Sequence, residues 1–513
     1  MTMREIVRQL SAAKACAPIH RYSTIHMRLE ENPMLIAFVR MAGESRPWAI
    51  AYGRFLDDEP KILSVPDGRN RLAVAKMCEE LAEDFLEYFR VTGYTWDPIT
   101  KESTIEESVP QLWVPSARHV EMFHHLQYAF WRVRKGDDRT QPLTVFARLS
   151  GWLFRESTRL GQQAVVDASK LFRDSYVFPT DNSSLGHLGA CLEWFGEHSD
   201  LKAARLAVRK AAELRDSPTL DPELDNKIFA PLIQRRIDLV AEGKETDSID
   251  LQIANNLAPE VLRRWELVKR AYRVISNDTR EVNPGVDELT SSTLQSFYSQ
   301  FQRIEENMQD PDMGPAYTQH PETDFHGSAA ASNYFVMTAA DTAYIAKLVH
   351  YDEELQAEAL ASGKAFMADV ISVQNNGTGR TTTPIWRLRV QVGEKLRIRE
   401  GERYSPLAEA LHGILVRSVD IIDAGNLEIV VEWTERKTVP LEHPISARPV
   451  DPEWVDHRLM FVPKDGSEFD KSKSRAVWNA AGGPGAWLTH GSAPSKIEPT
   501  IVDDITQLTG GKL

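Results

Sequence analysis

Apolar and polar residues alternate in short runs near the N-terminus. Three runs are typical of strands, and a fourth has the spacing of an amphipathic helix: PMLIAFVRMAG (33–43), PWAIAYGRFL (47–56), KILSV (61–65) and NRLAVAKMCEELAEDFLEYF (70–89). We therefore predict a small α+β unit over residues 1–95. Prolines punctuate the residues that follow, without a clear period, which predicts a linker over residues 96–116.

Helical periodicity dominates from residue 117 to residue 362, which we predict to be a helical domain. In PEVLRRWELVKRAYRVIS (259–276), large apolar residues recur at i, i+4, i+7, i+11 and i+14: Val261, Trp265, Val268, Tyr272 and Ile275. That spacing places them on one helical face, which we interpret as core packing. Residues 188–214 predict one helical hairpin that resembles a tetratricopeptide unit, but no second copy follows to form an array.

Residues 363–437 change to short β-type runs separated by turn signals. The five runs are AFMADVISVQ, TPIWRLRV, LRIRE, LHGILVRSVDII and NLEIVVEWT. This pattern predicts a small β-barrel of OB or SH3-like type. Residues 438–513 hold eight of the 28 prolines and predict a Pro/Gly-rich, largely irregular tail. The predicted fold class is thus a multidomain α+β protein with a helix-dominated centre.

Arginines alternate with apolar residues in the predicted barrel. In TPIWRLRV, Trp386 and Leu388 would share one face of the strand and Arg387 and Arg389 the other, because side chains alternate. LRIRE repeats the pattern, so pairing of the two runs would gather four arginines on the outer face. The predicted nucleic-acid-binding residues are Arg380, Arg387, Arg389, Lys395, Arg397 and Arg399.

This basic cluster contrasts with the formal charge of the whole chain, which is −14. Clustered guanidinium groups suit phosphate recognition, and small barrels present such faces to single-stranded nucleic acid. Two other interpretations stay open: contact with an acidic partner or with the chain's own acidic helices, or a solvated face that protects the sheet from aggregation. Further arginines on predicted helices would extend a basic stripe or lie on solvated faces: Arg205, Arg209, Arg263, Arg270 and Arg273.

A catalytic candidate lies in the predicted hairpin of residues 418–437. Asp423 precedes the turn, and Glu435 and Lys437 follow the next strand. This order is similar to that of PD-(D/E)xK nucleases, in which carboxylates hold Mg²⁺ and a lysine lies near the attacked phosphate. The pattern departs from the family at Thr434, where the central strand would carry the lysine. A divergent metal-dependent nuclease is therefore one alternative hypothesis.

The composition and the absence of several motifs argue against other classes of protein. Cys16, Cys78 and Cys191 form no CxxC pair, which argues against a disulfide framework or a zinc ribbon. The sequence has no GxxxxGK[ST], no GxSxG and no GxGxxG after a strand. It also has no secretory signal and no run of about 18 apolar residues. We therefore predict no metal site, no cofactor, no membrane contact and a cytoplasmic location.

These patterns favour a non-catalytic accessory or adaptor protein of a nucleic-acid-processing complex. The barrel would bind backbone phosphates of DNA or RNA, and the helical region would dock a protein partner. The alternatives are a protein scaffold without nucleic-acid contact and the nuclease described above.

Overall fold

The computed structural model describes residues 3–90, 94–96, 103–105, 110–131, 142–180, 186–309, 337, 340–376, 383–391, 396–407, 413–423, 425–434 and 454–464. Contacts divide the chain into two compact units. Unit 1 comprises Met1–Pro321 and Tyr344–Ala365, and unit 2 comprises Glu322–Ala343 and Phe366–Leu513.

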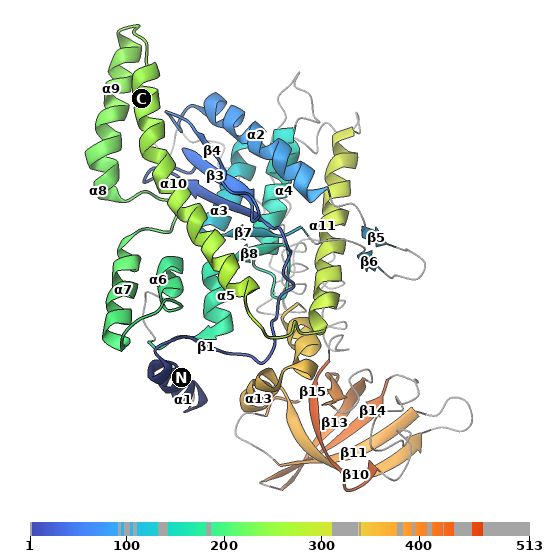
Figure 1. The fold of residues 1–513 in the computed structure, drawn as a ribbon. Helices are drawn as coiled ribbons and strands as arrows, with labels where there is room; N and C mark the ends of the chain where they lie inside the picture. Colours follow the sequence, from blue (N-terminus) through green and yellow to red (C-terminus); the bar gives the residue numbers. More distant parts are fainter. Residues whose placement is uncertain are drawn as a thin grey trace, which may run out of the picture. The chain divides into compact units, whose positions relative to one another are not determined.

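A five-stranded mixed sheet forms the centre of unit 1 (Figure 1). Its strands lie in the order β4 (Lys61–Ser64), β3 (Ala49–Arg54), β2 (Met34–Val39), β7 (Leu112–Val114) and β8 (Val165–Asp167). β3 pairs antiparallel with β2 and β4, whereas β7 pairs parallel with β2 and β8. The chain thus leaves β2 on one side through β3 and β4, and returns to its other side at β7.

The three strands predicted near the N-terminus are present, but the sheet extends beyond residues 1–95. β7 lies in the segment predicted to be a linker, and β8 lies in the segment predicted to be a helical domain. All three segments therefore fold around one sheet. Both strands have three residues, which is too short for a period-two pattern to stand out in the sequence.

Helices cover both faces of this sheet. Residues of β2 alternate between two apolar cores, with Ile36 and Phe38 in one and Leu35 and Val39 in the other. The first core contains α2 (Arg71–Phe89), α3 (Ala117–Phe130) and α4 (Pro142–Glu156), and the second is closed by α10 (Asp247–Ser276). α2 matches the predicted helix, and the Asn70 side chain caps its first turn.

α10 carries the apolar face that the sequence predicts. Val261, Trp265, Val268, Tyr272 and Ile275 are all buried. The helix begins at Asp247 instead of at Pro259, which lies within it. A proline lacks the backbone N–H and is favoured in a first helical turn, so Pro259 suggested a helix start that the structure does not have.

The remaining elements of unit 1 are α1 (Met3–Ala15), β1 (Ile19–His20), β5 (Tyr94–Trp96), β6 (Ser103–Ile105), α5 (Ala168–Ser175), β9 (Tyr176–Val177), α6 (Leu188–Glu193), α7 (Leu201–Glu213), α8 (Pro222–Leu224), a π-helical turn η2 (Asp225–Phe229), α9 (Ala230–Ala241), α11 (Gly285–Gln309), a 3-10 turn η5 (Val349–Tyr351) and α13 (Glu353–Ser362). α6 and α7 form the hairpin predicted over residues 188–214.

Most of the described part of unit 2 forms an antiparallel sheet of six strands. The strands are β10 (Phe366–Asn376), β11 (Thr383–Gln391), β14 (Asn426–Trp433), β13 (Ile414–Asp423), β12 (Arg403–Pro406) and β15 (Arg458–Pro463), in that order. β15 also pairs with β10, so the sheet closes on itself. Its interior is filled by large side chains that include Trp386, Trp433 and Trp454.

Two details of this sheet differ from the sequence prediction. Residues 396–399 of LRIRE form no strand, and β12 lies a few residues later. The closing strand β15 comes from residues predicted to belong to an irregular tail over residues 438–513. A strand that completes a sheet by pairing with β10 gains hydrogen bonds that depend on distant residues, which a local pattern does not reveal.

A buried histidine of unit 1 joins β2 to a segment that passes over the carboxyl end of this strand. His119 Nδ1 accepts a hydrogen bond from the Phe38 N–H (3.1 Å), and its Nε2 donates to the Asp216 carbonyl oxygen (2.8 Å). Burial lowers the pKa of His119 to about 3, against the opposing effect of the hydrogen bond to Asp216. The imidazole is therefore neutral in the folded chain.

This segment, residues 216–220, lies where open α/β sheets usually hold a ligand. That place is the crevice at the carboxyl ends of the strands where strand order reverses, here between β2 and β7. Arg40, just after β2, donates its N–H to the Pro218 carbonyl oxygen (2.8 Å), and its own carbonyl oxygen accepts from the Leu220 N–H (3.0 Å). The buried Arg264 side chain adds a hydrogen bond to the Ser217 carbonyl oxygen (2.7 Å).

We predict that His119 makes unit 1 less stable in mild acid. Below its ordinary pKa of 6.5, the unfolded chain binds a proton at this residue while the folded chain does not. The free energy of unfolding should therefore fall by about 2 kcal/mol between pH 7 and pH 5 on account of His119. His119→Gln keeps one acceptor and one donor but does not titrate, so chemical denaturation of this variant should lack that component. Equal pH dependence in the two proteins would contradict a buried neutral imidazole.

Candidate functional site

Arg387 and Arg389 lie on the outer face of β11, as the alternation predicts. Trp386, Leu388 and Val390 are buried, and the two arginines between them are exposed. Arg387 Nη1 donates to Glu428 Oε1 on the neighbouring strand β14 (2.8 Å). Arg389 lies near enough to a carboxylate, that of Asp423, to help keep it ionised.

Arg397 and Arg399 do not lie on a strand beside β11. The expected pairing of TPIWRLRV with LRIRE is wrong, because β11 pairs with β10 and β14. Residues 396–400 lead into β12, which β14 and β13 separate from β11, and the Gly401 N–H bonds to the Val416 carbonyl oxygen of β13 (2.9 Å). Two more predicted residues, Arg380 and Lys395, lie outside the described residues.

Carboxylates on neighbouring strands pair with two arginines of the barrel, of which only Arg387 belongs to the predicted basic face. Besides the pair on β11 and β14, Arg417 of β13 pairs with Glu432 of β14 (2.5 Å). The described residues of the barrel carry eight acidic and eight basic side chains, so this part has no net charge. Arg397 and Arg399 are exposed, and their guanidinium groups meet no carboxylate among the described residues.

The nuclease candidates are not arranged as a metal site in the described residues. Asp423 Oδ1 accepts hydrogen bonds from the Gly425 N–H (2.8 Å) and from Asn426 Nδ2 (3.0 Å), so its carboxylate closes the turn of its own hairpin. These bonds, that of Asn426 first, lower its pKa. Glu435 and Lys437 lie outside the described residues. Within the described ranges, no group of three or more His, Cys, Asp or Glu side chains could hold a metal ion.

Unit 1 contains a cavity of about 140 Å³ beside β8. Its lining includes Tyr22, residues 24–27, residues 157–163, Tyr344 and the α5 residues Lys170, Leu171, Asp174 and Ser175. Three basic side chains face it, and each pairs with a carboxylate of the chain: Arg159 with Glu156, Lys170 with Asp174 (3.1 Å) and Arg280 with Asp278 (2.6 Å). The cations of the cavity are therefore already compensated by internal acids.

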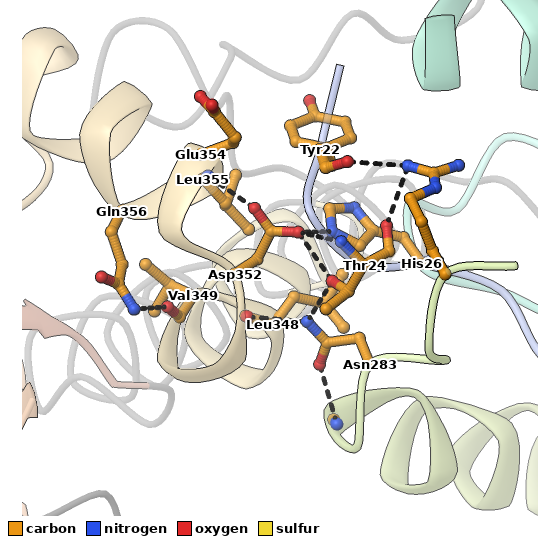
Figure 2. Close-up of polar contacts among 12 residues, drawn as sticks. Tyr22, Thr24, His26, Asn283, Leu348, Val349, Asp352, Glu354, Leu355 and Gln356 are labelled. Atoms are coloured by element: carbon orange, nitrogen blue, oxygen red, sulfur yellow. Dashed lines mark hydrogen bonds and ion pairs between the residues drawn. The ribbon is translucent and has the colours of Figure 1, made fainter. Parts of the chain in front are cut away.

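A buried carboxylate next to this cavity, Asp352, connects the two sequence segments of unit 1, Met1–Pro321 and Tyr344–Ala365, by hydrogen bonds (Figure 2). Asp352 Oδ2 accepts hydrogen bonds from the Thr24 N–H (2.8 Å) and the Thr24 hydroxyl (2.6 Å), and lies 3.2 Å from His26 Nε2. Its Oδ1 accepts from the Leu355 N–H (2.9 Å), which caps α13. Tyr344 completes the group, with its hydroxyl 3.1 Å from His26 Nδ1.

The arrangement resembles an acid–base relay in its order of tyrosine, histidine and aspartate, but its partners favour a structural role. Burial would raise the pKa of Asp352, yet hydrogen bonds from His26, Thr24 and Leu355 hold it well below its usual range. Both ring nitrogens of His26 are engaged, so neither is left for a substrate. The sequence did not reveal this group because Thr24 and Asp352 are 328 residues apart.

Comparison with known proteins identifies no relative. No protein-family model matches the chain, and neither a curated protein nor a solved structure matches it. In the part of the chain that the structure describes, no helix is long and apolar enough to cross a membrane. The function must therefore be argued from the chain's own residues.

We predict that Asp352 is an anchor on which the stability of unit 1 depends. Asp352→Ala removes the cap of α13 and leaves the half-buried Thr24 donors without an acceptor, which should lower the free energy of unfolding by about 2–4 kcal/mol. Glu353→Ala, at the exposed next position, should cost less than about 0.5 kcal/mol. Urea denaturation of the two variants makes the comparison. Equal, small losses would show that Asp352 does not hold these segments together.

Proposed function

We propose that this chain is an accessory component of a nucleic-acid-processing complex that binds backbone phosphates through those barrel arginines that have no carboxylate partner in the described structure. The observation that carries the proposal is the exposure of Arg397 and Arg399, which lack a carboxylate partner among the described residues. A guanidinium group without an internal partner is free to make the paired hydrogen bonds that a phosphate accepts. Arg389 stands on the same barrel with an exposed side chain.

The arrangement of the potential catalytic groups supports a binding role rather than catalysis. In the cavity beside β8, arginine and lysine side chains pair with internal acids, and both nitrogens of His26 are engaged. Asp423 closes a hairpin turn, and Glu432 pairs with Arg417. These groups therefore already have structural partners.

The barrel proposal is tested by comparing arginines that have a carboxylate partner with arginines that have none. Arg397→Gln/Arg399→Gln and Arg387→Gln/Arg417→Gln remove the same number of charges, but only the second pair is engaged in ion pairs. Fluorescence-anisotropy titrations of oligonucleotides measure the salt slope, which is the decrease in log K per unit of log[salt]. For the first variant, this slope should become smaller by up to about 0.9 per arginine on duplex and about 0.7 per arginine on single strands.

The control variant should retain most of the wild-type salt slope. The proposal fails if wild-type protein does not bind oligonucleotides at low salt, or if Arg397→Gln/Arg399→Gln binds with an unchanged slope. Circular dichroism of both variants verifies that the barrel remains folded.

A second candidate function, a protein scaffold, is favoured by helix α1. Four apolar residues of α1 are exposed at i, i+3, i+4 and i+7: Met3, Ile6, Val7 and Leu10. The opposite face meets the rest of unit 1, where Ala12 is buried and Arg8 pairs with Glu354. An apolar stripe with this spacing is the feature with which a helix enters a hydrophobic groove of a partner protein.

The scaffold candidate predicts a partner whose binding depends on this stripe. Val7→Ser/Leu10→Ser should release a partner that co-purifies with the chain at fixed stoichiometry, as measured by light scattering after size-exclusion chromatography. Leu72→Ser/Leu251→Ser, which changes two exposed leucines elsewhere, should retain it. Retention of the partner by both variants would exclude α1 as its docking site.

A further inference from the structure

Helix α7 of unit 1 presents a row of cations to solvent. Its exposed side chains include four basic residues that lie on one face at i, i+3, i+7 and i+8: Lys202, Arg205, Arg209 and Lys210. Among the described residues, none of these side chains makes an ion pair or hydrogen bond. The chain as a whole carries a charge of −14, so this row is not a sample of its average surface.

Several other exposed cations of unit 1 pair with carboxylates. Lys227 pairs with Glu223 (2.9 Å), Lys244 pairs with Glu242 (2.7 Å), and many arginines likewise meet a carboxylate. On α10, Arg263 pairs with Glu260 (3.1 Å) and Arg270 with Glu193 (2.8 Å). The exposed Arg273 has no ion pair among the described residues, but it stands alone on α10, whereas α7 groups four such cations.

Most of the cations on α7 do not serve the stability of the helix, although Lys210, in the last turn, suits the helix dipole. Lys202 and Arg205 are like charges at i, i+3, and Arg205 and Arg209 are like charges at i, i+4, which disfavours a helix. Lys202 also lies in the first turn, where the helix dipole favours acidic residues and none is present. The Asp200 cap and the buried Ala204 and Val208 hold the helix in place instead. Lys202, Arg205 and Arg209 are therefore not needed for the helix to form and are available to a ligand.

The spacing of the cations fits a ligand with closely repeated negative charges. Lys202 and Arg209 are seven residues apart, which is about 10.5 Å along a helix axis. One strand of duplex DNA places a phosphate every 3.4 Å or so along its axis, so the row spans about three phosphates. Arginine forks suit phosphate oxygens, and lysine adds point charges beside them.

From these observations, we infer that the exposed basic face of α7 is a second binding surface for the phosphate backbone of nucleic acid. The inference rests on the proposed function for its ligand class, but it uses residues of unit 1 and requires none of the barrel arginines. It assigns to the helical unit a direct contact with nucleic acid, where the sequence analysis expected a protein partner.

The test compares two variants that lose the same charge. Arg205→Gln/Arg209→Gln removes two cations without carboxylate partners, and Arg118→Gln/Arg215→Gln removes two that pair with Glu121 and Asp221. In anisotropy titrations of the full chain with duplex oligonucleotide at several salt concentrations, the α7 variant should lose about 1.8 of salt slope. The control should keep most of its slope, and thermal melts should match the wild type for both variants.

Each outcome separates this inference from the barrel proposal. Loss of slope in the α7 variant supports the inference, whatever the Arg397→Gln/Arg399→Gln variant does. An unchanged slope in the α7 variant, with loss in the barrel variant, overturns the inference and leaves the barrel proposal standing. Absence of oligonucleotide binding by the wild type overturns both. Stronger α7-dependent binding of polyglutamate than of the oligonucleotide would also overturn the inference, because it would assign the face to an acidic protein.

Discussion

Strand β2 is buried along its whole length, and the architecture of unit 1 depends on that constraint. A strand buried on both sides needs an apolar layer on each, which α2, α3 and α4 supply on one face and α10 on the other. Its parallel pairing with β7 requires a long crossover, and α2 lies within it. The buried His119 then fixes the segment that passes over the carboxyl end of β2, so the usual ligand crevice of such a sheet is filled by the chain itself.

The features that could be predicted from the sequence are those whose pattern is local. An apolar pattern repeats over several residues within each of these elements: the strands β2, β3 and β4, the helix α2 and the buried face of α10. The inner and outer faces of β11 follow from alternation alone. β7, β8 and β15 could not be recognised in this way, because each exists through pairing with a strand far away in the sequence. The same is true of Asp352, whose partners Thr24 and His26 come from the opposite end of unit 1.

Whether a cation is available to a ligand depends on the tertiary structure, because folding decides which cations meet an internal carboxylate. The sequence predicted Arg387 to be a phosphate-binding residue. In the structure, the pairing of β11 with β14 brings Glu428 within hydrogen-bond distance, so the Arg387 guanidinium group already has a carboxylate partner. The same analysis grouped Arg205 and Arg209 of α7 in a possible stripe, and the structure leaves them exposed, whereas Arg263 and Arg270 of α10 are paired. An acidic chain can therefore bind a polyanion through a local group of cations that have no internal partners in the described structure, such as the group on α7. This grouping, rather than net charge, supports the proposed role in nucleic-acid binding.

Lysine footprinting of the full chain tests this account most directly. Lys202 and Lys210 lie on the basic face of α7, whereas Lys227 and Lys244 are exposed lysines of unit 1 that pair with glutamates. Acetylation of each lysine is measured by mass spectrometry with and without an oligonucleotide at low salt. The account predicts slower acetylation of Lys202 and Lys210 in the presence of the oligonucleotide and unchanged rates at Lys227 and Lys244. Equal rates at Lys202 and Lys210 with and without bound oligonucleotide would contradict it.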